Sequence, residues 1–117
     1  MTQLLRYTVD IYNSAKVIDV TGSINITTAA KLQNIVNLLT MQESVVLNLE
    51  SVQLITTAGL ETLVEISRNA KERGKRVVLF KASDDFKDFA ESLDYFKFLV
   101  FAEALDEAVT KIKFFAE

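Results

Sequence analysis

The N-terminal part of the chain alternates apolar and polar residues, as half-buried strands do. Residues 5–12 place Tyr7 and Ile11 on one face and polar side chains on the other, which predicts a strand. A polar break and a second alternating run over residues 16–21 follow, so the two runs predict an antiparallel hairpin. Gly22 is expected to end the second strand.

Two short runs farther along, Val45–Leu49 and Val77–Phe80, are almost entirely apolar. Such runs are typical of parallel strands that are covered by helices on both faces. Between them, residues 58–73 are good helix formers, and Gly74 stands where a helix ends in a left-handed residue. The spacing predicts a right-handed βαβ unit.

Three further segments repeat apolar residues at helical spacing, starting near Ala29, Asp84 and Glu103. A last short strand is expected over Phe98–Phe101. The order β-β-α-β-α-β-α-β-α predicts one α/β domain over residues 1–117. We expect a mixed sheet of about five strands, an N-terminal hairpin plus parallel strands, with about four helices.

Composition narrows the possible functions. The chain has no Cys and no His, which excludes thiol nucleophiles, imidazole bases and almost every zinc site. We therefore expect no enzymatic activity, no catalytic residues, no cofactor and no metal. The net charge of -3 argues against a nucleic-acid partner. No signal-peptide pattern or membrane-spanning run occurs, so we expect a cytoplasmic protein without direct membrane insertion.

Charged residues are sparse in the first half of the chain and frequent in the second. Two segments expected to be loops, Gly22–Thr28 and Ser51–Leu60, carry hydroxyl and amide groups instead. Loops that follow parallel strands gather at one edge of a sheet, where binding sites form. This edge is therefore expected to be uncharged and rich in hydroxyl groups. These groups either contact a partner or only cap the helices that follow.

The start of the helix at residue 58 carries the most distinctive pattern. Thr56 or Thr57 is the expected N-cap of this helix. Gly59, in the first turn, is expected to let another surface approach the backbone. We therefore expect Gly59→Arg to abolish partner binding and to leave folding largely intact.

The run VVLNLESVQLITTAGLETLVEISRNAKERGKRVVLF (residues 45–80) resembles the centre of the STAS domain, the fold of bacterial anti-sigma factor antagonists. GSINITTA (residues 22–29) and LDYFKFLVFAEALDEAV (residues 93–109) are similar to the flanking segments of that family. The resemblance implies a bacterial protein-binding module that regulates transcription without catalysis. Antagonists of this family bind an anti-sigma factor that is also a kinase, and phosphorylation at the helix start ends the binding.

The chain departs from the family pattern at several polar positions. The usual phosphoacceptor is replaced by Ala58, and three family carboxylates are replaced by Thr56, Asn48 and Asn25. Thr57 keeps a hydroxyl one place earlier and is the phosphoacceptor candidate. Three interpretations follow: phosphorylation of Thr57, constitutive binding, or a partner that is not a kinase of the usual kind.

The predicted partner is an anti-sigma factor or a kinase-like regulatory protein, and the chain itself is expected to be a monomer or a weak homodimer. The alternative is an accessory STAS subunit of a stress-signalling scaffold or of a lipid-transport complex. A small flavodoxin-like nucleotide-binding enzyme is disfavoured because the chain has no glycine-rich phosphate loop. The predicted partner-binding residues are Ser23, Asn25, Thr27, Gln53, Thr56, Thr57, Ala58, Gly59, Glu61, Thr62 and Glu65.

Two charged clusters are interpreted as solvated helix faces. Asp84, Asp88 and Glu91 share one face of a predicted helix, where a divalent cation is the less favoured interpretation. The basic residues of 68–76 are interleaved with glutamates at pairing distance, which favours a charge-laced helix surface over a phosphate site.

Overall fold

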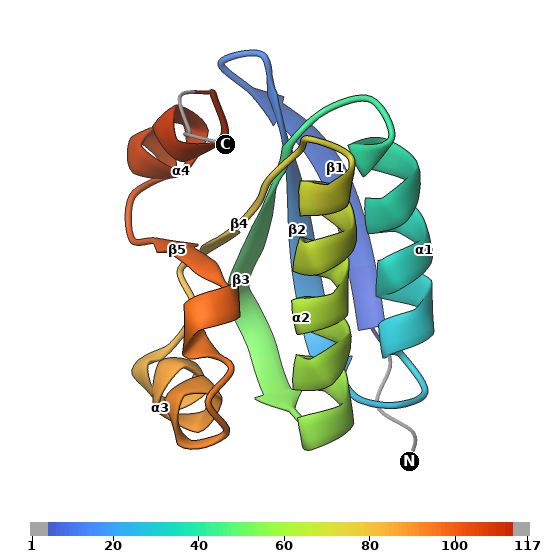
Figure 1. The fold of residues 1–117 in the computed structure, drawn as a ribbon, viewed down its shortest axis with the longest axis vertical. Coiled ribbons are helices and arrows are strands. Elements are labelled where there is room, and N and C mark those ends of the chain that lie inside the picture. Colours follow the sequence, from blue (N-terminus) through green and yellow to red (C-terminus); the bar gives the residue numbers. More distant parts are fainter. Residues whose placement is uncertain (1–4, 114–117) are drawn as a thin grey trace.

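A computed structural model of the chain describes residues 5–113 and forms one five-stranded sheet with strands in sequence order (Figure 1). The first two strands pair antiparallel, and every other neighbouring pair is parallel. The predicted fold class is therefore confirmed. The elements are β1 (Leu5–Tyr12), β2 (Ala15–Ile24), α1 (Ala29–Thr40), β3 (Val45–Ile55), α2 (Thr57–Glu72), β4 (Val77–Phe80), α3 (Asp84–Ser92), a 3₁₀ turn (Phe96–Phe98), β5 (Val100–Ala102) and α4 (Leu105–Lys113).

The two faces of the sheet are covered unequally. Leu47 and its neighbours on one face join the larger core with α1, α2 and α3. Val46 and Val78 on the other face pack with the apolar side of α4, which contacts β3, β4 and β5. Among the described helices, only α4 covers that face. The part of the face formed by β1 and β2 is therefore open to solvent, and polar side chains such as Asp10 and Asp19 lie there.

The predicted hairpin is present, with Tyr12 opposite Ala15 and a two-residue turn between them. Asn13 and Ser14 both have positive φ, 49° and 68°, as type I′ hairpin turns require. Lys113 on α4 donates to the Asn13 carbonyl at 2.7 Å, so the turn is also tied to the last helix.

β2 and β3 are longer than predicted. β2 continues through Gly22 to Ile24, and residues 51–55, expected to be a loop, form the second half of β3. The two strands stay paired, with Thr21 opposite Ser51, and the register shifts twice along the pair. These irregularities break the period of two on which the strand prediction depends.

The last strand and the last helix also begin later than predicted. The strand expected over Phe98–Phe101 is a 3₁₀ turn followed by β5, and α4 starts at Leu105 rather than at Glu103. The Glu103 N–H donates to the Glu107 carboxylate at 3.0 Å, so Glu103 lies in the cap before the helix. No helix among residues 5–113 is long and apolar enough to cross a membrane.

Candidate functional site

The two hydroxyl-rich segments meet at one edge of the sheet, as predicted. Ile24 lies opposite Ile55 at the carboxyl ends of β2 and β3. The Thr56 N–H donates to the Ile24 carbonyl at 3.0 Å, which joins the start of α2 to the end of β2. We call this surface, made of residues 25–28 and 53–57, the loop edge; in Figure 1 it lies below the starts of α1 and α2.

The first loop is closed by its own hydrogen bonds. The Asn25 side-chain oxygen accepts from the N–H groups of Thr27 and Thr28, at 2.9 and 3.0 Å. The Thr28 hydroxyl donates to the Ser23 carbonyl at 2.7 Å and accepts from the Asn25 N–H. Asn25 therefore satisfies two N–H groups in the turn before α1, whereas Thr28, which occupies the N-cap position of α1, makes no side-chain hydrogen bond to the helix.

At the second segment the predicted N-cap is confirmed for Thr56. Its hydroxyl accepts from the Gly59 N–H at 3.1 Å. Thr57 is the first residue of α2, is exposed, and makes no side-chain hydrogen bond within residues 5–113. The Thr57 hydroxyl therefore faces solvent.

Gly59 has a different role from the predicted one. It is buried, and a Cβ at this position would lie 2.2 Å from the Ile24 carbonyl oxygen and 2.7 Å from the carbonyl carbon. The surface that approaches Gly59 is the chain's own β2. The expectations that a partner approaches here, and that Gly59→Arg leaves folding intact, are therefore wrong.

The structure separates the predicted partner-binding residues by exposure. Ser23 is fully buried, so its side chain cannot reach a partner from this conformation. Thr62 is half-buried and donates to the Ala58 carbonyl at 3.0 Å. Asn25, Thr56 and Ala58 are half-buried as well, and the exposed members are Thr27, Gln53, Thr57, Glu61 and Glu65.

Two apolar residues on this surface were not among the predicted site residues. The Ile26 side chain is 79% exposed in the first loop, and the Leu54 side chain is 52% exposed at the end of β3. Exposed apolar side chains on a polar edge can supply the apolar core of a protein contact surface. The signal was present in the sequence, because each hydroxyl-rich segment contains apolar residues that a solvated cap does not need.

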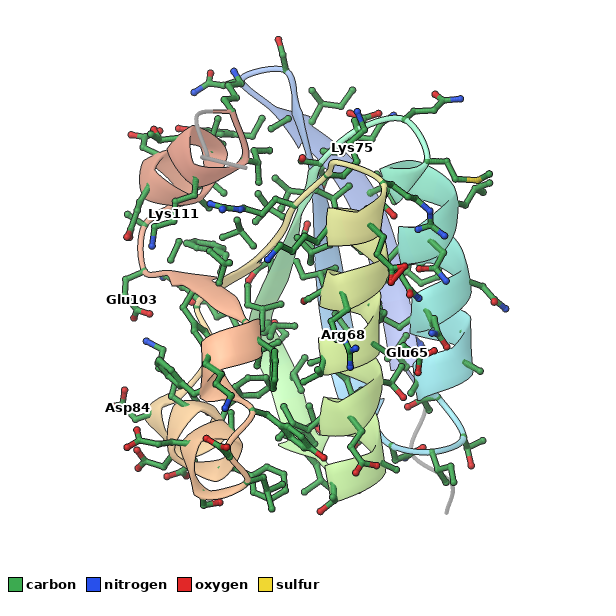
Figure 2. The ribbon with its side chains drawn as sticks, in the orientation of Figure 1. Glu65, Arg68, Lys75, Asp84, Glu103 and Lys111 are labelled. Carbon is green, nitrogen blue, oxygen red and sulfur yellow. The ribbon has the colours of Figure 1, made fainter. Side chains whose placement is uncertain are left out.

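Carboxylates border the loop edge on the α2 side. Glu61 accepts from the Tyr95 hydroxyl at 3.0 Å, and this hydrogen bond raises the pKa of Tyr95. Glu65 and Arg68 follow on α2, and both residues are exposed (Figure 2). Two exposed carboxylates, those of Glu61 and Glu65, therefore lie beside the loop edge on α2.

The charged clusters of the sequence form no second site. Among residues 5–113, no group of three acidic, His or Cys side chains could hold a metal ion. The basic residues diverge, since Arg73 donates to the Thr40 hydroxyl at 3.1 Å and Arg76 reaches the Lys111 carbonyl at 3.5 Å.

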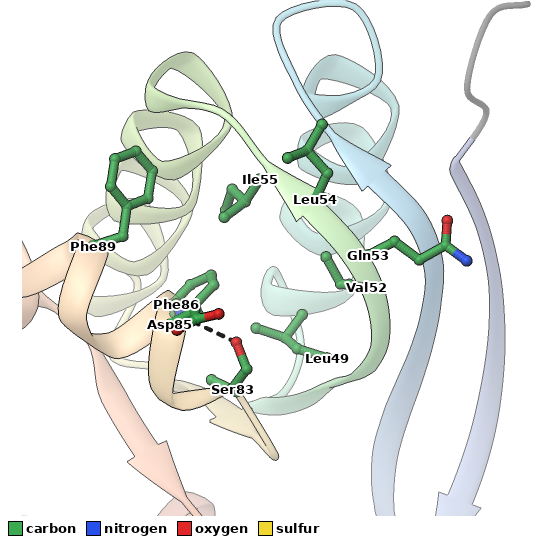
Figure 3. Close-up of a pocket in the computed structure, with 10 residues that line it drawn as sticks. Leu49, Val52, Gln53, Leu54, Ile55, Ser83, Asp85, Phe86 and Phe89 are labelled. Carbon is green, nitrogen blue, oxygen red and sulfur yellow. Dashed lines mark hydrogen bonds between the residues drawn. The ribbon is translucent and has the colours of Figure 1, made fainter.

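A shallow groove of about 350 Å³ adjoins the loop edge between the second half of β3 and α3 (Figure 3). It exists because β4 pairs with β3 only as far as Phe80 opposite Asn48, and Lys81, with φ 57°, begins the turn toward α3. Ser83, which lines the groove, is the N-cap of α3 and accepts from the Phe86 N–H at 3.0 Å. The lining is mostly apolar and comprises Leu49, Val52, Gln53, Leu54, Ile55, Ala82, Ser83, Asp85, Phe86 and Phe89.

Comparisons with known structures agree with this arrangement. The fold is similar to that of an anti-sigma factor antagonist from Mycobacterium paratuberculosis, with a TM-score of 0.78 and 17% identity over 94% of this chain and 95% of that chain. It is also similar to the anti-sigma factor antagonist SpoIIAA in its unphosphorylated form, with a TM-score of 0.72 and 12% identity over 96% and 100% of the two chains.

A third similar structure is the murine anion transporter Slc26a9 in its inward-facing state, with a TM-score of 0.74 and 9% identity over 96% of this chain and 22% of the transporter. No curated protein sequence matches the chain. At these identities the solved structures show a shared fold. The sequence profile of the STAS domain matches residues 6–108, almost the whole described sheet and its helices. On this match, the chain belongs to the STAS domain family.

Proposed function

We propose that this STAS domain is a non-enzymatic module that binds an anti-sigma factor or a kinase-like regulatory protein through the loop edge, in the cytoplasm, and so controls transcription. The observation that carries the proposal is the exposure of Thr57 on one surface with the apolar side chains of Ile26 and Leu54. The similarity of the fold to anti-sigma factor antagonists supports it.

The loop edge has the composition of a protein contact surface. Ile26 and Leu54 supply apolar area, and Thr27, Gln53 and Thr57 surround them with exposed polar groups. A central apolar patch contributes most of the binding free energy, while a polar rim excludes water from it. Buried Ser23 and Gly59 belong to the scaffold that holds this surface in place.

Thr57 is the position at which a phosphate would interrupt this contact. A phosphate adds about -1.5 to -2 charges to the surface, and Glu61 lies one helical turn farther along α2. The amino end of a helix tolerates negative charge, so the modified domain would stay folded while its docking surface became anionic. Ala58 carries no hydroxyl, and we therefore propose that the unmodified domain is the binding form.

The proposal is tested by affinity capture with the tagged domain from its native host, with mass spectrometry of the captured proteins and of Thr57. The captured protein is then purified and titrated against Ile26→Asp and, as a matched control, Met41→Asp; Met41 is 66% exposed at the far end of α1. We expect an anti-sigma or kinase-like protein whose affinity falls at least tenfold with Ile26→Asp only. Equal affinities for both variants would place the contact elsewhere.

The alternative function, an accessory STAS subunit of a stress-signalling scaffold or of a lipid-transport complex, is favoured by one observation. Ala58 occupies the family's usual acceptor position, so this chain can serve a partner that does not phosphorylate it. Capture of an ATPase subunit of a transporter, with the same dependence on Ile26, would support this alternative instead.

A further inference from the structure

The outer side of β1 is an open sheet edge. β1 pairs with β2 on one side and has no strand on the other among residues 5–113. It is eight residues long, the chain contains no proline, and the side chains of Val9 and Ile11 are 39% and 72% exposed. Long edge strands with exposed apolar residues and no proline are prone to pair with another strand.

The charges on β1 are left unneutralised within the described chain. Arg6, Thr8 and Asp10 alternate onto the sheet face that carries α4, and neither Arg6 nor Asp10 has an ion-pair partner among residues 5–113. Asp10 lies beside Asp19, and their hydrogen bond and like charge raise the pKa of Asp10. A cation brought to Asp10 from outside would relieve this repulsion.

We propose that a second copy of this chain covers the edge, with the two β1 strands antiparallel and Thr8 on the two-fold axis. In this register Arg6 of each copy lies opposite the partner's Asp10, so two oppositely charged pairs form on one face. On the other face Tyr7 lies opposite the partner's Val9, and Leu5 lies opposite the partner's Ile11. The five-stranded sheet is thereby doubled across the axis.

The alternation of β1 selects this register over its neighbour. A two-fold axis at Val9 would place Arg6 opposite the partner's Tyr12 and Asp10 opposite the partner's Thr8, so both charges would remain unpaired. A one-residue slip thus removes both ion pairs, although it keeps the backbone hydrogen bonds.

Helix α1 flanks the same edge. Lys31 donates to the Leu5 carbonyl at 3.4 Å and lies 5.7 Å from the centre of the Tyr7 ring, at the start of β1. Leu38, two helical turns later on the same side of α1, is 63% exposed. Leu38 is therefore a second exposed apolar side chain on the helix that flanks β1, while the Lys31 contacts reach only Leu5 and Tyr7 at the start of the strand.

One strand pair and its flanking side chains bury less area than a stable interface requires. We therefore expect a weak dimer, with a dissociation constant on the order of 100 μM at low salt. The inference does not depend on the proposed function, because the β1 edge and the loop edge are different surfaces.

A charge-swap cycle followed by sedimentation velocity from 10 μM to 1 mM tests the proposal. Arg6→Asp and Asp10→Arg should each weaken association at least tenfold, since each places like charges opposite each other. The double variant Arg6→Asp/Asp10→Arg should recover most of the association. A wild-type chain that stays monomeric at 1 mM, or a double variant no better than the singles, would overturn the proposal.

Cysteine cross-linking then tests the register, because the wild-type chain has no thiol. Residues directly opposite each other in an antiparallel pair are close enough for a disulfide, so Thr8→Cys should form a covalent dimer under mild oxidation. Thr110→Cys, exposed on α4, is the control and should react much more slowly. Faster cross-linking by Val9→Cys than by Thr8→Cys would contradict the assigned axis.

Discussion

At the scale of single residues, Gly59 shows how one position can be read in two ways. The sequence places it in the first turn of a helix beside hydroxyl groups, where a glycine can expose backbone to a partner. The structure closes that space with the Ile24 carbonyl group. Local sequence cannot distinguish the two interpretations, because the approaching group comes from a strand about thirty-five residues earlier in the chain.

Gly59→Ala should therefore reduce the free energy of unfolding by about 1–3 kcal/mol, the usual range for overpacking a core. The measurement is urea denaturation followed by far-UV circular dichroism. Gly74→Ala is the comparison, because Gly74 has φ +75° and no atom within 4 Å of an added Cβ. It should cost about 1–2 kcal/mol through backbone strain alone. A fully stable Gly59→Ala variant would show that β2 and α2 can separate here.

Thr57→Glu should keep the stability of the wild type and weaken partner binding at least tenfold. The first turn of a helix accepts a negative charge, whereas the loop edge loses its neutral surface. Isothermal titration with the captured partner measures the effect, and Thr110→Glu, another exposed helical threonine, should bind normally. Unchanged affinity for Thr57→Glu would exclude Thr57 from the contact.

At the scale of elements, the helices could be predicted from their helical period, and the short strand β4 could be predicted from its continuous apolar run. Val77–Phe80 is a strand with the bounds that its apolar run indicates, and α1 starts at Ala29 as expected. The ends of β2 and β3 could not be predicted, because their two register shifts interrupt the alternation. The sequence also predicts the loop edge, but it names Asn25 only as a partner contact. An asparagine that accepts hydrogen bonds within its own loop cannot be distinguished in the sequence from one that binds a partner.

Asn25→Ala should test these hydrogen bonds. It removes the oxygen that accepts from the N–H groups of Thr27 and Thr28 in the turn before α1, and loss of a comparable cap at a helix typically costs about 1 kcal/mol. Thermal or urea unfolding should show this loss, whereas Thr27→Ala, exposed in the same loop, should stay within about 0.5 kcal/mol of the wild type. Equal stability of both variants would mean that water replaces the Asn25 oxygen.

The cap of α4 should make stability depend on pH. The hydrogen bond from the Glu103 N–H, and to a smaller extent the one from Lys111, keeps the pKa of Glu107 below its ordinary value of 4.5. Because this pKa is lowered in the folded state, the contribution is present above pH 4.5 and is lost as the pH falls through the folded pKa. Glu107→Gln should lower the melting temperature at pH 7 and have little effect in more acidic buffer. Glu91→Gln, exposed on α3, should show no such pH-dependent difference.

At the scale of the whole molecule, the sheet positions every surface discussed above. Its carboxyl edge carries Thr57 and the apolar pair of Ile26 and Leu54, its outer strand carries Arg6 and Asp10, and α4 closes part of one face. Sequence could place the first of these surfaces because loops after parallel strands converge. It could not show which side chains of that surface reach solvent, because exposure depends on packing between distant segments.

The bond between the Thr56 N–H and the Ile24 carbonyl has a consequence for the kinetics of recognition. Together with the internally bonded Asn25 loop, it makes the proposed docking surface preorganised, so little conformational entropy should be lost when a partner binds. Association should then proceed without a slow rearrangement. Variants of Ile26 or Leu54 should differ mainly in how long the complex lasts, with dissociation rates that change far more than association rates.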